Sequence, residues 1–182
     1  MARKITIALL IIISYLLQTT YSSQISIGNI TPNLLIIIVC IFALLRGRKE
    51  GLLIGFFAGL LPDLFYGYAD ITGFYSLVYM YLGYMIGFIH EIIYTDDIII
   101  PVAFTAICDF LSNFAYYIIA FALRNKLQFN VYFKDIILPE LIYTVFLTVF
   151  LYKLYKVIND ILEEHERKRE AKYGTGNIGN VL

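Results

Sequence analysis

Residues 51–67 read GLLIGFFAGLLPDLFYG, in which a small or polar residue recurs at every fourth position. These positions are Gly51, Gly55, Gly59, Asp63 and Gly67. Because an α-helix turns about 100° per residue, positions four apart drift by only about 40° and form one slanted stripe with few side chains. Such a stripe lets a second helix approach closely inside a bilayer, where van der Waals contact holds helices together. The stretch therefore predicts a membrane helix that packs tightly along this stripe.

The next apolar segment contains a shorter stripe of the same kind, formed by Gly83 and Gly87, again four residues apart. Packing of the chain against itself is the favoured interpretation for most of these glycines. Pro62 lies late in the first of the two segments and lacks a backbone donor. It predicts a kink in that helix.

The composition of the whole chain points to the same environment. The 182 residues are 60% hydrophobic and only 15% charged. Soluble domains are about 45–50% apolar and about 25% charged, so a water-soluble globule is excluded. The formal net charge is zero, which gives no basis for nucleic-acid binding. Cys40 and Cys108 lie within apolar stretches and are expected to be small buried residues, not a disulfide or a metal site.

Six apolar segments, separated by charged or turn-rich breaks, predict an all-α polytopic membrane protein with six transmembrane helices. The runs are continuous and do not alternate, which favours helices over the strands of a barrel. The second and third segments reach spanning length only if flanking polar residues lie at the membrane interface. The expected spans cover residues 5–21, 32–45, 51–68, 74–93, 98–123 and 135–153, within a membrane domain of residues 1–158.

The placement of Lys and Arg predicts the orientation. With the N-terminus inside, eleven Lys and Arg residues fall on the cytoplasmic side and three outside. Arg46, Arg48 and Lys49, between the second and third spans, are among the eleven. The bias favours an even number of spans with both termini in the cytoplasm. The first segment has no clear A-x-A cleavage site, so we expect it to remain as a span.

Residues 159–182 are predicted to form a charged cytoplasmic tail. Glu163–Arg167 and Glu164–Lys168 are pairs of favourable order four residues apart, so the last helix is expected to continue into this tail. The glycine-containing end that follows is expected to be disordered. Since its basic and acidic residues nearly cancel, the tail is not a polybasic lipid-binding tract.

Asp109 lies near the middle of the longest predicted span, where a carboxylate is costly and usually faces a partner or water. It is either a proton or cation site, or bonded to hydroxyl or amide groups on other helices. The second interpretation is favoured because no Lys or Arg lies mid-span. Glu140, in the first turn of its helix, is expected among the headgroups. The remaining intramembrane polar residues are expected to be few and scattered.

The sequence contains no zinc-protease, nucleophile-elbow or phosphate-loop motif. We therefore expect no enzymatic activity, no metal and no cofactor.

The segment before the glycine stripe opens with Pro32-Asn33-Leu34 and closes with Leu44-Leu45-Arg46-Gly47, and Gly73 follows the stripe. Together these residues resemble the MreD family of the bacterial rod-shape system. The specific part of the resemblance covers residues 32–73. The length, the six spans, the short loops and the charged tail fit the same family, and Asp109 resembles an acidic position that the family often shows.

The resemblance implies a non-enzymatic role in lateral wall synthesis in the bacterial cytoplasmic membrane. It implies as partners an MreC-like protein, MreB filaments, RodA and a class B penicillin-binding protein. It also implies a fold similar to the substrate-binding S-component of energy-coupling-factor vitamin transporters. The residues that match the motif are expected to shape a helix-packing core.

Two functions follow. The first is a membrane scaffold that binds the single transmembrane helix of an MreC-like partner and helps to position peptidoglycan synthases. The alternative is a transporter subunit that binds a small vitamin-like molecule, motivated by Asp109, Pro62 and the implied fold. Polar residues converging on one cavity would favour the transporter, and their expected scatter favours the scaffold.

Overall fold

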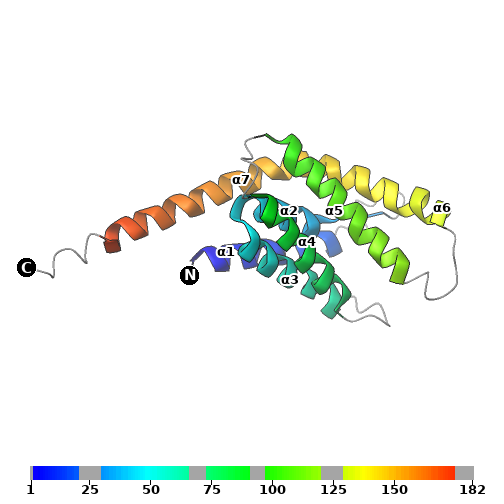
Figure 1. Cartoon of the computed structure of the whole chain (residues 1–182), viewed down its shortest axis with the longest axis horizontal. Coiled ribbons are helices and arrows are strands. Elements are labelled where there is room, and N and C mark those ends of the chain that lie inside the picture. The colour runs from blue at the N-terminus through cyan, green and yellow to red at the C-terminus, as the bar shows by residue number, and fades with distance from the viewer. Residues whose placement is uncertain (1, 21–29, 66–72, 91–96, 120–128, 175–182) are drawn as a thin grey trace, which may run out of the picture.

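The computed structural model describes residues 2–20, 30–65, 73–90, 97–119 and 129–174 (Figure 1). The described helices are α1 (Ala2–Thr20), α2 (Leu34–Arg46), α3 (Arg48–Phe65), α4 (Phe74–His90), α5 (Ile99–Tyr117), α6 (Phe129–Tyr132), the π-helical turn η3 (Phe133–Ile137) and α7 (Leu138–Gly174). The predicted all-α class is confirmed. Each of the six predicted spans overlaps one of the long helices.

α2 is the central helix of the bundle (Figure 1). Its sequence is apolar on every side, and each residue from Leu35 to Leu44 is no more than 1% exposed. It contacts α1, α3, α4, α5 and α7. Its 13 residues extend only about 20 Å, less than the roughly 30 Å hydrocarbon core. The apolar side chains of the second predicted span therefore face protein, and they include Cys40, a buried free thiol like Cys108.

Among the described residues, three helical stretches are long and apolar enough to cross a membrane: Arg3–Thr20, Ile99–Tyr117 and Phe129–Lys168. Most of their residues are not buried inside the bundle, so their apolar side chains face outward. Apolar side chains that face outward around a packed core are typical of a membrane protein. The chain is an all-α membrane protein, and six crossings with cytoplasmic termini stay a prediction.

α6, η3 and α7 form one continuous helical run, which begins earlier than predicted. Pro139 explains the π-helical turn that precedes it, because proline has no backbone N–H and crowds the carbonyl four residues earlier. The turn widens, and the N–H of Leu138 donates to the carbonyl of Phe133, five residues back. As expected, α7 continues beyond its predicted span, and its charged end leaves the bundle (Figure 1). The predicted disorder after Gly174 lies outside the described residues.

Candidate functional site

α3 and α4 pack backbone against backbone. A Cβ atom added at Gly55 would lie less than 3.0 Å from the backbone of Tyr79, and one added at Gly59 would meet the α4 backbone in the same way. Gly51 and Gly83 face each other, so that each carbonyl occupies the space that the other's Cβ would take. Backbone atoms cannot rotate aside, so a larger residue at these positions would force the helices apart. The two glycine stripes meet each other.

The other described glycines of the candidate set, Gly87 within α4 and Gly73 before it, lie near the ends of that helix. A Cβ added at Gly87 would lie less than 3.0 Å from Gly47 and Arg48, which link α2 to α3. Gly47 has φ +84°, a conformation that glycine adopts without strain, so α3 follows α2 directly. Gly73, with φ +92°, forms the turn before α4, and an added Cβ there would have nothing within 4 Å. Gly67 lies outside the described residues.

Asp63 binds the start of α4. Its carboxylate accepts hydrogen bonds from the N–H groups of Tyr75 (3.1 Å) and Ser76 (2.8 Å) and from the Ser76 hydroxyl (2.6 Å). The first N–H groups of a helix have no acceptor within it and form the positive end of its dipole. Gly73, just before α4, has no side chain to accept them. The carboxylate on α3 therefore caps α4, a role that its place in the stripe did not indicate.

Asn33, which the sequence analysis used only as part of a motif, joins three helices. Its side-chain oxygen accepts from the N–H of Ile36 (3.2 Å) and caps α2. Its amide nitrogen donates to the hydroxyl of Tyr79 on α4 (2.9 Å), and its backbone N–H donates to the hydroxyl of Thr144 on α7 (3.1 Å). These bonds are buried, so they fix the entry of the central helix against its neighbours.

Asp109, on α5, lies beside this network and is fully buried. Asn33 and Thr144 are its polar neighbours, yet among the described residues neither carboxyl oxygen has a partner at hydrogen-bond geometry. Glu140 lies half-buried on α7, where its carboxyl interacts with that of Asp109. The sequence predicted that Glu140 lies among the headgroups and that the polar residues within the membrane are scattered. The structure instead brings Glu140, Asp109, Asn33 and Thr144 together in the interior of the bundle. Such an unpartnered carboxyl can accept a hydrogen-bond donor or a cation.

Comparison with known proteins decides the family. Residues 1–158 match the family described as rod shape-determining protein MreD. The chain belongs to the MreD family. Membership gives the chain a role in determining rod shape and confirms the resemblance carried by residues 32–73. No curated protein and no solved structure matches the chain, so the similarity to a vitamin-transporter S-component stays a prediction.

In this MreD-family chain, arginines and glutamates connect four helices at one end of the bundle. Arg3 of α1 forms ion pairs with Glu50 of α3 (2.5 Å) and Glu166 of α7 (2.6 Å). Arg46 of α2 pairs with Glu166 (3.4 Å) and donates to the side chain of Asn159. The Arg46 side chain is only 9% exposed, so this residue of the predicted topology signal also holds α2 against α7.

The other two residues of the predicted topology signal lie nearer the surface. The guanidinium of Arg48 lies over the ring of Phe88, 5.2 Å from its centroid, and so connects α3 to α4. Lys49 is exposed on α3. Their contribution to orientation stays a prediction.

Proposed function

We propose that this chain is a non-catalytic scaffold of the wall-elongation machinery in the bacterial cytoplasmic membrane, with six spans and both termini in the cytoplasm. It binds the transmembrane helix of an MreC-like protein and helps to position RodA and a class B penicillin-binding protein, together with MreB. The family's role in rod-shape determination supports this proposal. The backbone contact between α3 and α4 carries the scaffold interpretation, because it makes a rigid core from glycines that would otherwise be available to a partner helix.

The outer face of α7 suits a partner helix. Within the predicted membrane domain, exposed apolar side chains recur there mostly three or four residues apart, from Leu138 to Val157. This stripe extends about 28 Å, close to the thickness of the roughly 30 Å hydrocarbon core that a spanning partner helix crosses. On α4 the exposed apolar residues extend only from Leu77 to Phe88. We therefore place the partner helix along α7.

The test is affinity purification of the tagged chain from its native membrane in mild detergent. We expect an MreC-like protein with wall-elongation enzymes to co-purify, and its absence contradicts the scaffold. A variant with Ile142, Phe146 and Phe150 changed to Ala should lose most of this partner. The matched control changes Leu77, Tyr81 and Phe88 to Ala, also exposed, and should keep it. Equal recovery with both variants contradicts α7 as the interface.

A transporter subunit that binds a small molecule is the second candidate, favoured by the polar residues gathered around Asp109. It predicts co-purification with an ATPase pair and a large membrane coupling protein. The scaffold predicts that Asp109→Asn retains both the MreC-like partner and rod shape. Asp160→Asn, exposed on α7, is the control. Loss of shape with Asp109→Asn alone favours the transporter.

Orientation has its own test, because the two native thiols are buried. A Glu163→Cys variant carries its new thiol on the exposed charged part of α7. A membrane-impermeant maleimide should label it in inverted vesicles and leave it unlabelled in spheroplasts. The reverse pattern contradicts cytoplasmic termini.

A further inference from the structure

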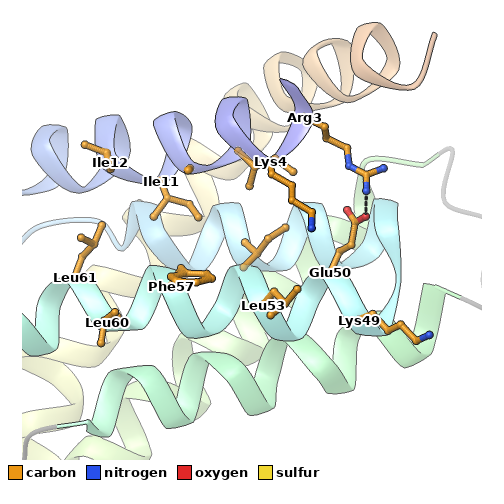
Figure 2. Close-up of a pocket in the computed structure, with 13 residues that line it drawn as sticks. Arg3, Lys4, Ile11, Ile12, Lys49, Glu50, Leu53, Phe57, Leu60 and Leu61 are labelled. Carbon is orange, nitrogen blue, oxygen red and sulfur yellow. Dashed lines mark ion pairs between the residues drawn. The ribbon is translucent and has the colours of Figure 1, made fainter. Parts of the chain in front are cut away.

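α1 and α3 enclose a groove with a volume of about 550 Å³ (Figure 2). Its walls are apolar over most of its length, with Ile7 and Ile11 from α1 and Ile54, Phe57 and Leu61 from α3. In Figure 2 the labelled side chains of α1 lie on one side of the groove and those of α3 on the other. Phe57 is 54% exposed, so the groove opens to the surroundings of the bundle, which for this chain include lipid.

Contacts at both ends keep the groove from collapsing or widening. At one end Arg3 pairs with Glu50 at 2.5 Å, the dashed contact of Figure 2. Beyond the other end the rings of Tyr15 and Phe65 meet, with centroids 5.7 Å apart. The space between the two helices is therefore a built feature of the fold.

The groove is too small to enclose a helix, which could lie only over its open side. Its lining residues on α3 run from Lys49 to Leu61, about 18 Å of helix. The volume of about 550 Å³ is well below the roughly 1,400–2,000 Å³ that about 18 Å of helix fills with its side chains. An α-helix with its side chains is 10–12 Å across and needs roughly 80–110 Å². An extended peptide would leave its backbone polar groups without partners in an apolar groove, which is costly in lipid. A single hydrocarbon chain is narrow enough for the groove and has no backbone polar groups to satisfy.

The charge at the Arg3–Glu50 end selects the headgroup. Lys4 and Lys49 line the groove there, and among the described residues neither has an acidic partner. In Figure 2 the Lys4 side chain extends from α1 toward α3, whereas the Lys49 side chain points away from α1, so it is the Lys4 ammonium that faces the groove. Arg3 is already neutralised by two glutamates. An ammonium group beside an apolar groove, with no acidic partner among the described residues, complements an anion attached to a hydrocarbon chain, and lysine binds phosphate as a point charge.

We propose that this groove binds one acyl chain of an anionic phospholipid, whose phosphate lies at Lys4. The lipid ties α1 to α3 along the length where their side chains leave a gap. This site goes beyond the proposed scaffold function and does not depend on the partner helix at α7.

The headgroup is tested by native mass spectrometry of the full chain, titrated with phosphatidylglycerol or with phosphatidylcholine of the same acyl composition. We expect the parent to prefer phosphatidylglycerol. Lys4→Gln should weaken its binding roughly fivefold, because one lysine near a headgroup contributes about that factor, and should leave phosphatidylcholine binding unchanged. Lys134→Gln with Lys153→Gln, both exposed and outside the groove, should change neither. Equal binding of the two lipids by the parent overturns the proposal.

The acyl chain is tested by filling the groove. Ala8 lines it, so Ala8→Phe should reduce binding of both lipids several-fold. Leu9→Phe is the control, because Leu9 is 52% exposed and outside the lining. Unchanged binding by Ala8→Phe overturns the proposal.

A third test replaces Phe57 with a photo-crosslinking residue in native membranes and identifies which molecule occupies the groove. An adduct of phospholipid mass supports the site, and an adduct to a protein overturns it. Displacement of phosphatidylglycerol by equimolar polyprenyl phosphate also overturns the assignment to a phospholipid. None of these outcomes changes recovery of the MreC-like partner, so the two proposals fail separately.

Discussion

α3 meets its two neighbours in opposite ways. Toward α4 it presents Gly51, Gly55 and Gly59, and the two backbones touch. Toward α1 it presents Leu53 and Phe57, each about half-exposed, and the helices enclose a groove of about 550 Å³. Within a bilayer no hydrophobic effect draws helices together. The size of the side chains on each face therefore decides whether a neighbouring helix touches or leaves room for lipid.

The largest expected effect comes from breaking the tight side. Gly55→Leu places a side chain where the backbone of Tyr79 and Met80 already lies, and neither can move without shifting α4. We expect a loss of at least about 3 kcal/mol, the upper range for overpacking, seen as a lower melting temperature in detergent or as loss of monodisperse protein.

Leu53→Ala is the matched control, since Leu53 lies two residues earlier on the open side. Its melting temperature should stay close to that of the parent. If the two variants melt alike, the distinction between the two sides of α3 is wrong.

A smaller effect is expected at the end of the tight side. Asp63→Ala removes the acceptor of three hydrogen bonds and leaves two N–H groups at the start of α4 without it. The expected cost is about 1–3 kcal/mol, measured by thermal unfolding in detergent. Asp160→Ala, exposed on α7, should have no measurable effect. Equal stability of the two variants would show that α4 is capped by other means.

The open side should respond more weakly. Arg3→Gln breaks the ion pairs with Glu50 and Glu166, whose side chains are 26% and 38% exposed. Partly exposed pairs contribute up to about 1 kcal/mol. We expect little change in melting but faster backbone hydrogen exchange in α1. Arg167→Gln is the control. Arg167 pairs with Glu163 and its side chain is 77% exposed, so hydrogen exchange in α1 should stay unchanged. Faster exchange in α3 and α4 instead would contradict the end contact.

The smallest effect is expected away from both sides of α3. A hydrogen bond from the ammonium of Lys168 lowers the pKa of Glu164 on the exposed end of α7. A carboxyl with a lowered folded-state pKa adds stability above its unfolded pKa and loses it as the pH falls through the folded value. Since solvent screens this pair, Glu164→Gln should melt like the parent at pH 7 and at pH 3. A clear loss at pH 7 that disappears at pH 3 would contradict this expectation.

The fold class was predictable because its signals are local. Small residues four apart mark the contact face of α3, and continuous apolar runs mark the helices. The burial of α2 was not predictable in the same way. Its isoleucines and leucines suit lipid and protein equally, so composition alone cannot say which of the two surrounds them.

The polar contacts were not predictable because their partners are distant in the chain. Asn33 bonds Tyr79, 46 residues away, and Thr144, 111 residues away. Asp63 lies within the glycine stripe, and only the position of α4 shows that it caps a neighbouring helix. For Asp109 the sequence indicated depth in the membrane, whereas its lack of a hydrogen bond among the described residues and its nearness to Glu140 depend on how α5 meets α7.

α2 leaves the ribosome second, and its surroundings are completed last. Of the five helices that surround it only α1 precedes it in the chain, and α5 and α7 begin after residue 98. Until α7 has been synthesised, part of the α2 surface has to face lipid. Contact with lipid tails is about as favourable for its apolar side chains as contact with apolar protein side chains. α2 can therefore insert into the bilayer before α5 and α7 exist. Its lipid contacts are later replaced by protein contacts of similar polarity.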